Sequence, residues 1–242
     1  MSLLEKIKES VDQDAQVRSV LVGSHWVVVC SRNCGMASAL HGSHRHGVPE
    51  VRDAGQLQLK SMRALLEMLE SDSLLEISIG VAALNSLLIV DESQAVEINA
   101  MDVLVERGKD RDVALVGHFP FIPQLRQSAK QLWVLEKNPA LDEFPAEAAA
   151  DLLPRADLVA ITGTTLINGT LEELLGYCQP GSTVMVLGPS TPLSPVLFEH
   201  GIDILSGTHI VDEEAVLRTV GQGASFRQVK GVKLLTFLST KE

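Results

Sequence analysis

The chain has 242 residues and a mass of 26.1 kDa, and 45% of its residues are hydrophobic. This composition is that of a globular protein and excludes intrinsic disorder. Lys and Arg number 20 against 31 Asp and Glu, and the net charge of −11 divides into −5 for residues 1–100 and −6 for the rest. Because no tail or half of the chain is basic, nucleic-acid binding and polybasic membrane binding are disfavoured.

Membrane insertion and secretion are disfavoured by the pattern along the chain. No apolar run approaches the roughly 20 residues of a membrane helix, and the charged N-terminus does not read as a secretory signal. Cys30, Cys34 and Cys178 are an odd number and make a poor disulfide framework. We therefore expect a cytoplasmic protein, and base rates among oligomers favour a homodimer.

The first 98 residues predict a small α+β domain. Apolar spacing predicts a helix over 3–11, and β-branched residues predict a hairpin of strands 17–23 and 26–30. Residues 31–55 are rich in Gly, Ser, His and Asn and predict a long loop. Helical periodicity returns over 57–69 and 72–88, with Asp72 as the predicted N-cap of the second helix.

After Asn99 the pattern changes to short apolar runs that alternate with helical segments. Strands are expected at 112–117, 131–135, 157–162, 183–187, 202–205 and 232–237. Helices are expected at 123–129, 146–153, 166–177, 195–199 and 212–220. Such runs are typical of parallel strands covered on both faces. The sequence thus predicts an α/β protein with a Rossmann-like, doubly wound domain over residues 99–242.

Ligands of such sheets bind beyond the carboxyl ends of the strands. The predicted strands 112–117, 157–162 and 183–187 are each followed by a loop. The last two loops are rich in small and hydroxyl-bearing residues, and the first contains Phe119 and Pro120. Candidate ligand-binding residues are Gly117, Phe119, Pro120, Thr162, Gly163, Thr164, Thr165, Asn168, Gly169, Thr170, Gly188, Pro189, Ser190 and Thr191. Glycine admits close approach, and helix N-termini offer N–H groups to an anion. The same residues serve as ordinary turns and caps, but their clustering favours a binding site.

Three further residues extend this candidate site. Glu136 lies 19 positions after Gly117, near where a ribose-binding acid falls, or it is a solvated strand-end carboxylate. His118 and His209 follow predicted strands and are candidate catalytic acids or bases, or hydrogen-bonded turn residues. Classical NAD(P) binding is disfavoured, because Phe119 and Pro120 occupy the space of the pyrophosphate cradle.

A second cluster has the chemistry of a metal site. Cys34, His41, His44 and His46 offer thiolate and imidazole ligands that suit a divalent transition metal as cofactor. Their spacing matches no structural zinc pattern, so a histidine-rich surface loop is the alternative. Cys178, at a predicted helix end, is expected to be inert.

Three motifs together resemble a family of prokaryotic proteins assigned to heavy-metal chelation. They are ITGTTLINGTL (161–171), LGPSTPL (187–193) and VGHFP (116–120). The resemblance implies an enolase N-terminal-like domain joined to a Rossmann-like domain, with the site in the crevice between them. The histidine cluster falls on none of these motifs.

Two functional hypotheses follow. In the first, the crevice binds a small anionic or heterocyclic molecule, such as a metal chelator, its precursor or a metal chelate, and enzymatic processing is left open. In the second, the protein is a non-catalytic metal binder that uses the loop with Cys34, His41, His44 and His46.

Overall fold

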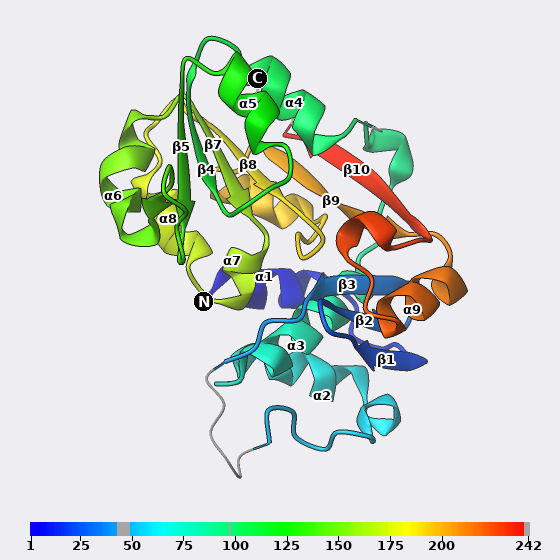
Figure 1. The fold of residues 1–242 in the computed structure, drawn as a ribbon. Helices are drawn as coiled ribbons and strands as arrows, with labels where there is room; N and C mark the ends of the chain where they lie inside the picture. Colours follow the sequence, from blue (N-terminus) through cyan, green and yellow to red (C-terminus); the bar gives the residue numbers. More distant parts are fainter. Residues whose placement is uncertain (43–48, 97, 240–242) are drawn as a thin grey trace.

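The structure is a computed structural model that describes residues 1–42, 49–96 and 98–239. It contains a three-stranded antiparallel sheet formed by the N-terminal part of the chain and a seven-stranded, mostly parallel sheet formed by the rest (Figure 1). The predicted α/β fold class is confirmed. No helix in the described part of the chain is both long and apolar enough to cross a membrane.

The large sheet has the strand order β10-β9-β8-β7-β4-β5-β6. Its strands are β4 (Asp112–Val116), β5 (Gln131–Glu136), β6 (Phe144–Pro145), β7 (Leu158–Thr162), β8 (Thr183–Leu187), β9 (Ile204–Ile210) and β10 (Val232–Leu238). The direction of winding reverses between β4 and β7, whose residues Val116 and Ile161 pair side by side. This switch point is where ligands of doubly wound sheets bind. The strand β10 is antiparallel to β9, so the parallel arrangement expected for the strands after Asn99 does not extend to this edge.

Helices cover both faces of this sheet. Successive side chains of β4 point to opposite faces, and because consecutive ones are buried, both faces must be covered. Val113 and Leu115 pack on one face with α4 and α5, whereas Ala114 belongs to the core on the other face with α6 and α8. The helices and 3-10 turns are α4 (Ala100–Arg107), α5 (Ile122–Ser128), η4 (Ala146–Ala148), α6 (Ala149–Leu152), η5 (Leu153–Arg155), α7 (Thr164–Ile167), α8 (Leu171–Tyr177), η6 (Pro195–His200), α9 (Glu213–Gly221) and η7 (Phe226–Gln228). The helix predicted over 166–177 is divided into α7 and α8, and Gly169 between them has a positive φ of 75°.

The N-terminal part packs a small sheet on a buried helix. Its elements are α1 (Leu3–Ser10), β1 (Ser19–Val22), β2 (Trp26–Cys30), β3 (Cys34–Ser38), η1 (Leu57–Leu59), α2 (Met62–Leu66), η2 (Glu67–Glu70), α3 (Leu74–Leu87) and η3 (Glu92–Gln94). The strand β3 occupies the first part of the predicted loop over 31–55. A side chain at Gly35 would overlap the backbone of Ala82 and Ser86 in α3. The small residues that close packing requires here remove the usual β-strand signal, which is why the sequence did not predict β3.

Glu76 ties the start of α3 to the segment that precedes it. Its side chain is only 2% exposed. It accepts hydrogen bonds from the Arg52 backbone N (2.7 Å), the Arg52 guanidinium (2.8–3.1 Å) and the Ser71 hydroxyl (2.6 Å). The N-cap is Ser73 rather than the predicted Asp72, because the Ser73 hydroxyl accepts from the Glu76 N–H.

The two sheets share one apolar core. Val29 and Leu84 of the N-terminal part belong to the same buried cluster as Val159 and Leu235 of the large sheet. Within this contact, the backbone N–H of Ser38 donates to the hydroxyl of the buried Ser190 (2.9 Å). The end of β3 is thereby fixed against the loop that follows β8.

The different surroundings of Gly35 and Gly176 predict opposite effects on stability when each is replaced by Ala. Gly35→Ala should lower the free energy of unfolding by at least about 2 kcal/mol, because the methyl group pushes β3 away from α3. Gly176→Ala, at an open position of α8, should raise it by about 0.5–1 kcal/mol through helix propensity. Urea unfolding of the two variants measures both changes. A neutral Gly35→Ala would contradict the packing described here.

Glu76 predicts an acid-dependent loss of stability. Burial acts to raise the pKa of the Glu76 carboxyl, but hydrogen bonds from Arg52 and Ser71 outweigh it, so the pKa is lowered. The stabilisation is then complete above the unfolded-state pKa of about 4.3 and is lost as the pH falls through the lower folded-state value. Glu76→Gln should cost about 1–3 kcal/mol at pH 7 and clearly less at pH 3. The exposed Glu67→Gln is the control, and an equal cost at both pH values would refute the assignment.

Candidate functional site

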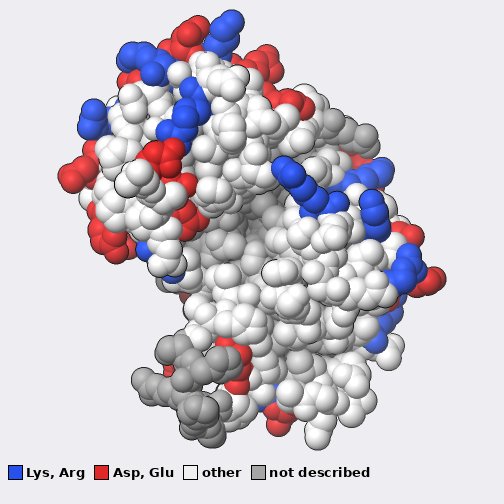
Figure 2. Space-filling model, in the orientation of Figure 1, with Lys and Arg blue, Asp and Glu red and all other residues white. Residues whose placement is uncertain are grey.

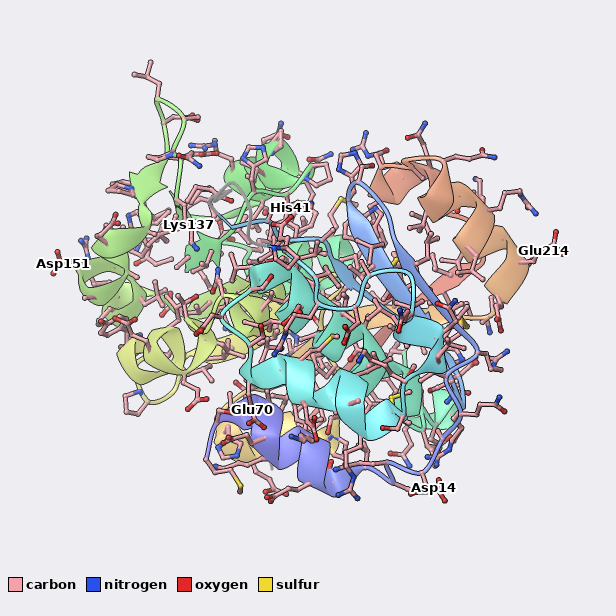
Figure 3. All side chains as sticks on the ribbon, turned by 90° about the horizontal axis from the view of Figure 1, so that it is seen from below. Asp14, His41, Glu70, Lys137, Asp151 and Glu214 are labelled. Carbon is pink, nitrogen blue, oxygen red and sulfur yellow. A yellow bond between two sulfur atoms is a disulfide. The ribbon has the colours of Figure 1, made fainter. Side chains whose placement is uncertain are left out.

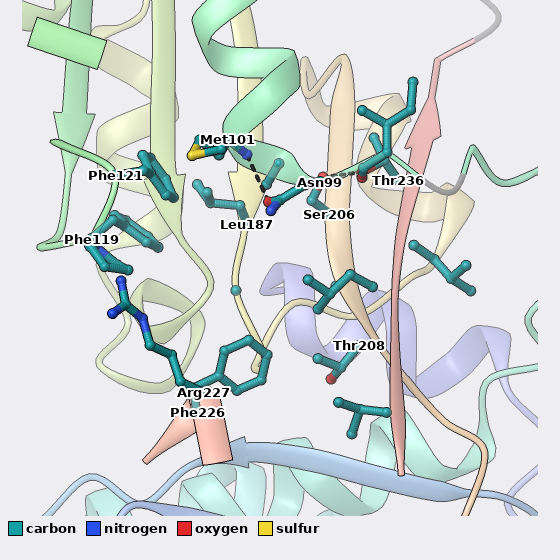
Figure 4. A pocket seen from close by; sticks show the side chains of 18 of the residues that line it. Asn99, Met101, Phe119, Phe121, Leu187, Ser206, Thr208, Phe226, Arg227 and Thr236 are labelled. Carbon is teal, nitrogen blue, oxygen red and sulfur yellow. Dashed lines mark hydrogen bonds between the residues drawn. The ribbon is translucent and has the colours of Figure 1, made fainter. Parts of the chain in front are cut away.

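An apolar cavity of about 480 Å³ lies beyond the carboxyl ends of β4 and β8, over one face of β9 and β10 (Figure 4). Its lining comes from the loop after β4, the end of β8, the strands β9 and β10, the start of α4 and the turn η7. All of these residues have numbers of 98 or higher. The cavity therefore belongs to the C-terminal part of the chain, whereas the resemblance implied a site between the two domains.

Aromatic rings form two walls of this cavity. Phe119 and Phe121 are stacked, with ring centroids 5.1 Å apart and an interplanar angle of 21°. Phe226 packs on Trp26 at 5.5 Å, and the Trp26 indole N–H donates to the Ala224 carbonyl (3.0 Å). A residue of the N-terminal part thus holds η7 in place. Figure 4 shows Phe119 and Phe121 on one side and Phe226 with Arg227 below them.

Arg227 is the one charged side chain among the described residues that line the cavity. It is exposed, and within the described part of the chain its guanidinium has no hydrogen bond or ion pair. Figure 4 shows its head directed toward Phe119. Figure 2 shows this face of the molecule hollowed in the middle, with uncharged residues in the hollow and Lys or Arg along one rim.

Hydroxyl groups line the floor of the cavity. The Ser206 and Thr236 hydroxyls are hydrogen-bonded at 2.6 Å, and Thr236 also donates to the Ile98 carbonyl at 3.0 Å. Thr208 lies on the same face of β9 as Ser206 and is half-buried. The result is an apolar pocket with a few convergent polar groups and a single cation, the usual composition of a small-molecule site.

His118 is held by a buried carboxylate on the far side of the same loop. Its Nδ1 lies 2.9 Å from Glu143 Oε1, and Glu143 Oε2 accepts from the Ala140 backbone N–H at 2.9 Å. The Glu143 side chain is 5% exposed and that of His118 is 65% exposed. Both residues border a second hollow of about 550 Å³, which shares Phe119 and Pro120 with the apolar cavity.

The loops at the switch point use most of their polar groups internally. An added Cβ on Gly117, whose φ is 110°, would lie 3.0 Å from the side chain of Thr162. The Thr162 hydroxyl pairs with that of Thr164 (3.1 Å), and Thr165 donates to the Thr162 carbonyl (2.7 Å). These contacts are typical of turn and cap residues.

The other predicted loop residues are divided between packing contacts and a third hollow. Thr170 donates to the Asn168 side chain (2.7 Å), and the hollow of about 290 Å³ beside α1 and α3 is lined in part by Thr165, Asn168 and Gly169. Ser190 and Thr191 are buried, and an added Cβ on Gly163 would lie 2.6 Å from the Thr191 hydroxyl. Pro189 joins Gly188 to this packed segment. Of the predicted ligand-binding residues, Phe119, Pro120 and Gly188 line the apolar cavity.

Glu136 and His209 lie away from this cavity. Glu136 ends β5 opposite Pro145 of β6 and accepts from the Lys137 backbone N–H (3.0 Å). Lys137, which follows Glu136, lies toward one side of the molecule, and Glu214 of α9 lies at the other side (Figure 3). His209 lies within β9, which is longer than the predicted strand 202–205, and its Nε2 is 3.4 Å from Glu92 Oε1. Because Thr208 faces the cavity, alternation directs His209 to the opposite face.

The predicted metal set does not assemble in the described part of the chain. Cys34 forms a disulfide with Cys30, although three cysteines are an odd number and make a poor disulfide framework. A metal ligates thiolate rather than disulfide sulfur, which removes Cys34 from the set. His41 (labelled in Figure 3) pairs through Nδ1 with both carboxylate oxygens of Glu50 at 3.1 Å. His44 and His46 lie outside the described residues.

Several site residues carried little signal in the sequence. Arg227 and Phe226 belong to a three-residue 3-10 turn, which leaves no periodic pattern. Glu143 lies seven positions beyond β5 and reaches His118 only through the fold. Ser206 and Thr208 follow a predicted strand, and this position was the one available indication of their role.

Comparison with known proteins gives a consistent assignment. Two family models, both described as "putative heavy-metal chelation", match residues 99–238 (DUF364) and 4–88 (DUF4213). An uncharacterized protein of Methanocaldococcus jannaschii is 30% identical over 179 residues, which are 71% of this chain and 69% of that protein.

Two crystal structures of proteins with unknown function from the DUF364 family have similar folds. The protein of Desulfitobacterium hafniense has a TM-score of 0.85 at 25% identity, with 98% of each chain covered. That of Pyrococcus horikoshii has a TM-score of 0.85 at 19% identity, covering 98% of this chain and all of the other. The resemblance stated from the sequence motifs is thus confirmed, and the chain belongs to the DUF364 family, whose model is described as "putative heavy-metal chelation".

Proposed function

We propose that the protein binds a small planar anion, of the class of aromatic or heteroaromatic carboxylates, in the apolar cavity. The observation that carries this proposal is a stacked aromatic wall, Phe119 and Phe121, near the guanidinium of Arg227, which has no partner among the residues that the structure describes. Planar rings stack favourably on such walls, and Arg binds carboxylates through two parallel hydrogen bonds. The cavity volume of about 480 Å³ lies within the range of small-molecule sites.

The charge of the cavity indicates which part of a chelation system it would bind. A free divalent cation is repelled by Arg227 and finds no carboxylate, imidazole or thiolate among the described lining residues. A heterocyclic carboxylate, in contrast, is attracted by Arg227 and itself offers oxygen and nitrogen ligands to a metal. The favoured ligand is therefore a chelator, its precursor or an anionic chelate rather than the metal alone.

His118 and Glu143 border the second hollow, so they can move a proton only on a ligand that extends past Phe119 and Pro120 out of the apolar cavity. When Nδ1 of His118 donates to the buried Glu143 carboxylate, the lone pair of Nε2 is left free to accept a proton. Within the described residues Nε2 has no hydrogen-bond partner. Glu143 acts as the positioning residue, and Phe119 and Pro120 line both the second hollow and the apolar cavity.

Arg227 and Phe119 should determine the affinity for a suitable probe. We expect isothermal titration with pyridine-2,6-dicarboxylate to show binding that Arg227→Ala weakens about 10- to 100-fold, the loss of a charge-assisted pair. The affinity of Arg227→Lys should lie between those of wild type and Arg227→Ala, because Lys keeps the positive charge but cannot form two parallel hydrogen bonds to a carboxylate. Phe119→Ala should also weaken binding. The control is Arg218→Ala, which removes an exposed cation paired with Glu214 in α9. Equal affinity of Arg227→Ala and wild type would exclude this cavity as the anion site.

The hydrogen bond between His118 and Glu143 predicts which ring nitrogen of neutral His118 carries the proton. Neutral His118 should carry its proton on Nδ1, as long-range ¹H–¹⁵N spectra of the imidazole report. Glu143→Ala should abolish this preference, whereas the signals of exposed His25 stay unchanged. Protonation on Nε2 in the wild-type protein would show that Glu143 does not orient His118.

A further inference from the structure

We propose that Cys30, Cys34 and Glu213 form a redox-controlled binding site for a soft divalent cation, separate from the apolar cavity. One sulfur from each cysteine and one Glu213 carboxylate oxygen all lie within 4.8 Å of one another. The cysteines come from β2 and β3, and Glu213 is the first residue of α9. Two thiolates and one carboxylate are three ligands of a zinc-type set, which leaves the fourth position open to water or a chelator.

The hairpin register suits both redox states. Cys30 and Cys34 are directly paired across β2 and β3, with their Cα atoms 4.0 Å apart, and such partners carry their side chains on one face of the sheet. This separation permits the disulfide that the structure contains. It also permits two thiolates to share one ion, because each metal–sulfur bond spans about 2.3 Å.

The redox step decides whether the ion binds. Reduction by a dithiol breaks the Cys30–Cys34 bond and transfers two electrons and two protons to the sulfurs, while the dithiol becomes a disulfide. Binding of a divalent cation then releases the two thiol protons. In the oxidised form the two sulfurs are bonded to each other, and no thiolate is available.

Arg18 completes the charge balance of this site. Its guanidinium is paired with Glu213, donates from Nε to the Ser31 carbonyl (2.7 Å) and places Nη2 3.9 Å from Cys34 Sγ. Two thiolates and a carboxylate carry three negative charges, which a divalent cation and Arg18 neutralise. When the ion takes one Glu213 oxygen, Arg18 can hold the other and orient the carboxylate, as partners of metal ligands commonly do.

The surroundings are those of a partly open site. Cys30 is fully buried, Cys34 is half-buried, and the Glu213 and Arg18 side chains are 35% and 45% exposed. A purely structural role explains the pair less well. The disulfide spans four positions of a hairpin that strand pairing already closes, and a short loop gains the least stability from a cross-link.

Cadmium titration of the full chain tests the proposal, with thiolate-to-metal ultraviolet absorbance as the readout. Protein reduced with a phosphine should bind one equivalent of Cd²⁺ with this absorbance, and protein reoxidised with diamide should show none. Cys34→Ser should weaken binding at least 100-fold. Glu213→Gln, which keeps both thiols, should weaken it about 10-fold while retaining the absorbance.

Two matched controls separate this site from other groups. Cys178→Ser should bind as wild type, because Cys178, the C-cap of α8, donates to the Leu174 carbonyl and burial raises the pKa of its thiol to about 11. Replacing His41, His44 and His46 together by Ala should also leave the affinity unchanged. Three results would each overturn the proposal: reduced wild type that shows no thiolate-to-metal absorbance, Glu213→Gln that binds Cd²⁺ as tightly as wild type, or a triple histidine variant that no longer binds Cd²⁺. Circular dichroism of every variant verifies the fold.

Discussion

The apolar core that runs from the three-stranded sheet into the seven-stranded sheet is the constraint on which the rest of the structure depends. Because Val29 and Leu84 share a buried cluster with Val159 and Leu235, the two sheets cannot separate without exposing aliphatic surface to water. The loops after β3 and β8 are therefore held in contact, as the Ser38–Ser190 hydrogen bond shows. The same contact brings Trp26 to η7, where it fixes the residues next to Arg227.

This arrangement lets a strongly acidic chain offer a site to an anion. The net charge of −11 is spread over both parts of the sequence, and exposed charges farther away than about 8 Å are largely screened at physiological ionic strength. Inside the cavity the local composition matters more. Its described lining has Arg227 and no carboxylate, and its aromatic walls lower the local polarity. An anion near Arg227 therefore meets a favourable local field despite the unfavourable total charge.

The sequence predicted those parts of the fold that rest on hydrophobic periodicity. Runs such as 112–117 and 183–187 are buried on both faces and became strands of the large sheet. The strand β3 was missed for a physical reason, since Gly35 and its small neighbours are selected for close packing on α3 rather than for β propensity.

The candidate site was less accessible to such reasoning. Hydroxyls in the loop after β7 turned inward to cap their own backbone, as Thr165 does toward Thr162. Arg227 and Glu143 reach the site through tertiary contacts that no local pattern encodes. Residues such as Phe119 and Gly188 were predictable because the end of a parallel strand is a position fixed by topology.

The two proposed sites differ in the kind of chemistry that they recognise, and they share a structural support. The cavity presents a cation and aromatic faces, whereas the reduced cysteine pair presents two soft anions and a carboxylate. Arg227 and Glu213 lie on one continuous segment, α9 followed by η7. This segment is anchored to the three-stranded sheet at two places. Arg18, just before β1, pairs with Glu213, and Trp26 of β2 donates to the Ala224 carbonyl.

Between these anchors, Val216 and Val220 of α9 pack on Val28 of β2 and Met36 of β3. The packing of this one helix on one hairpin thus sets the position of Glu213 relative to the cysteines and of Arg227 relative to the cavity. Close-packed protein interiors transmit displacements rather than deforming gradually. A change that displaced α9 from the hairpin would therefore alter the anion cavity and the cation site together, whereas removal of a single ligand would alter only its own site.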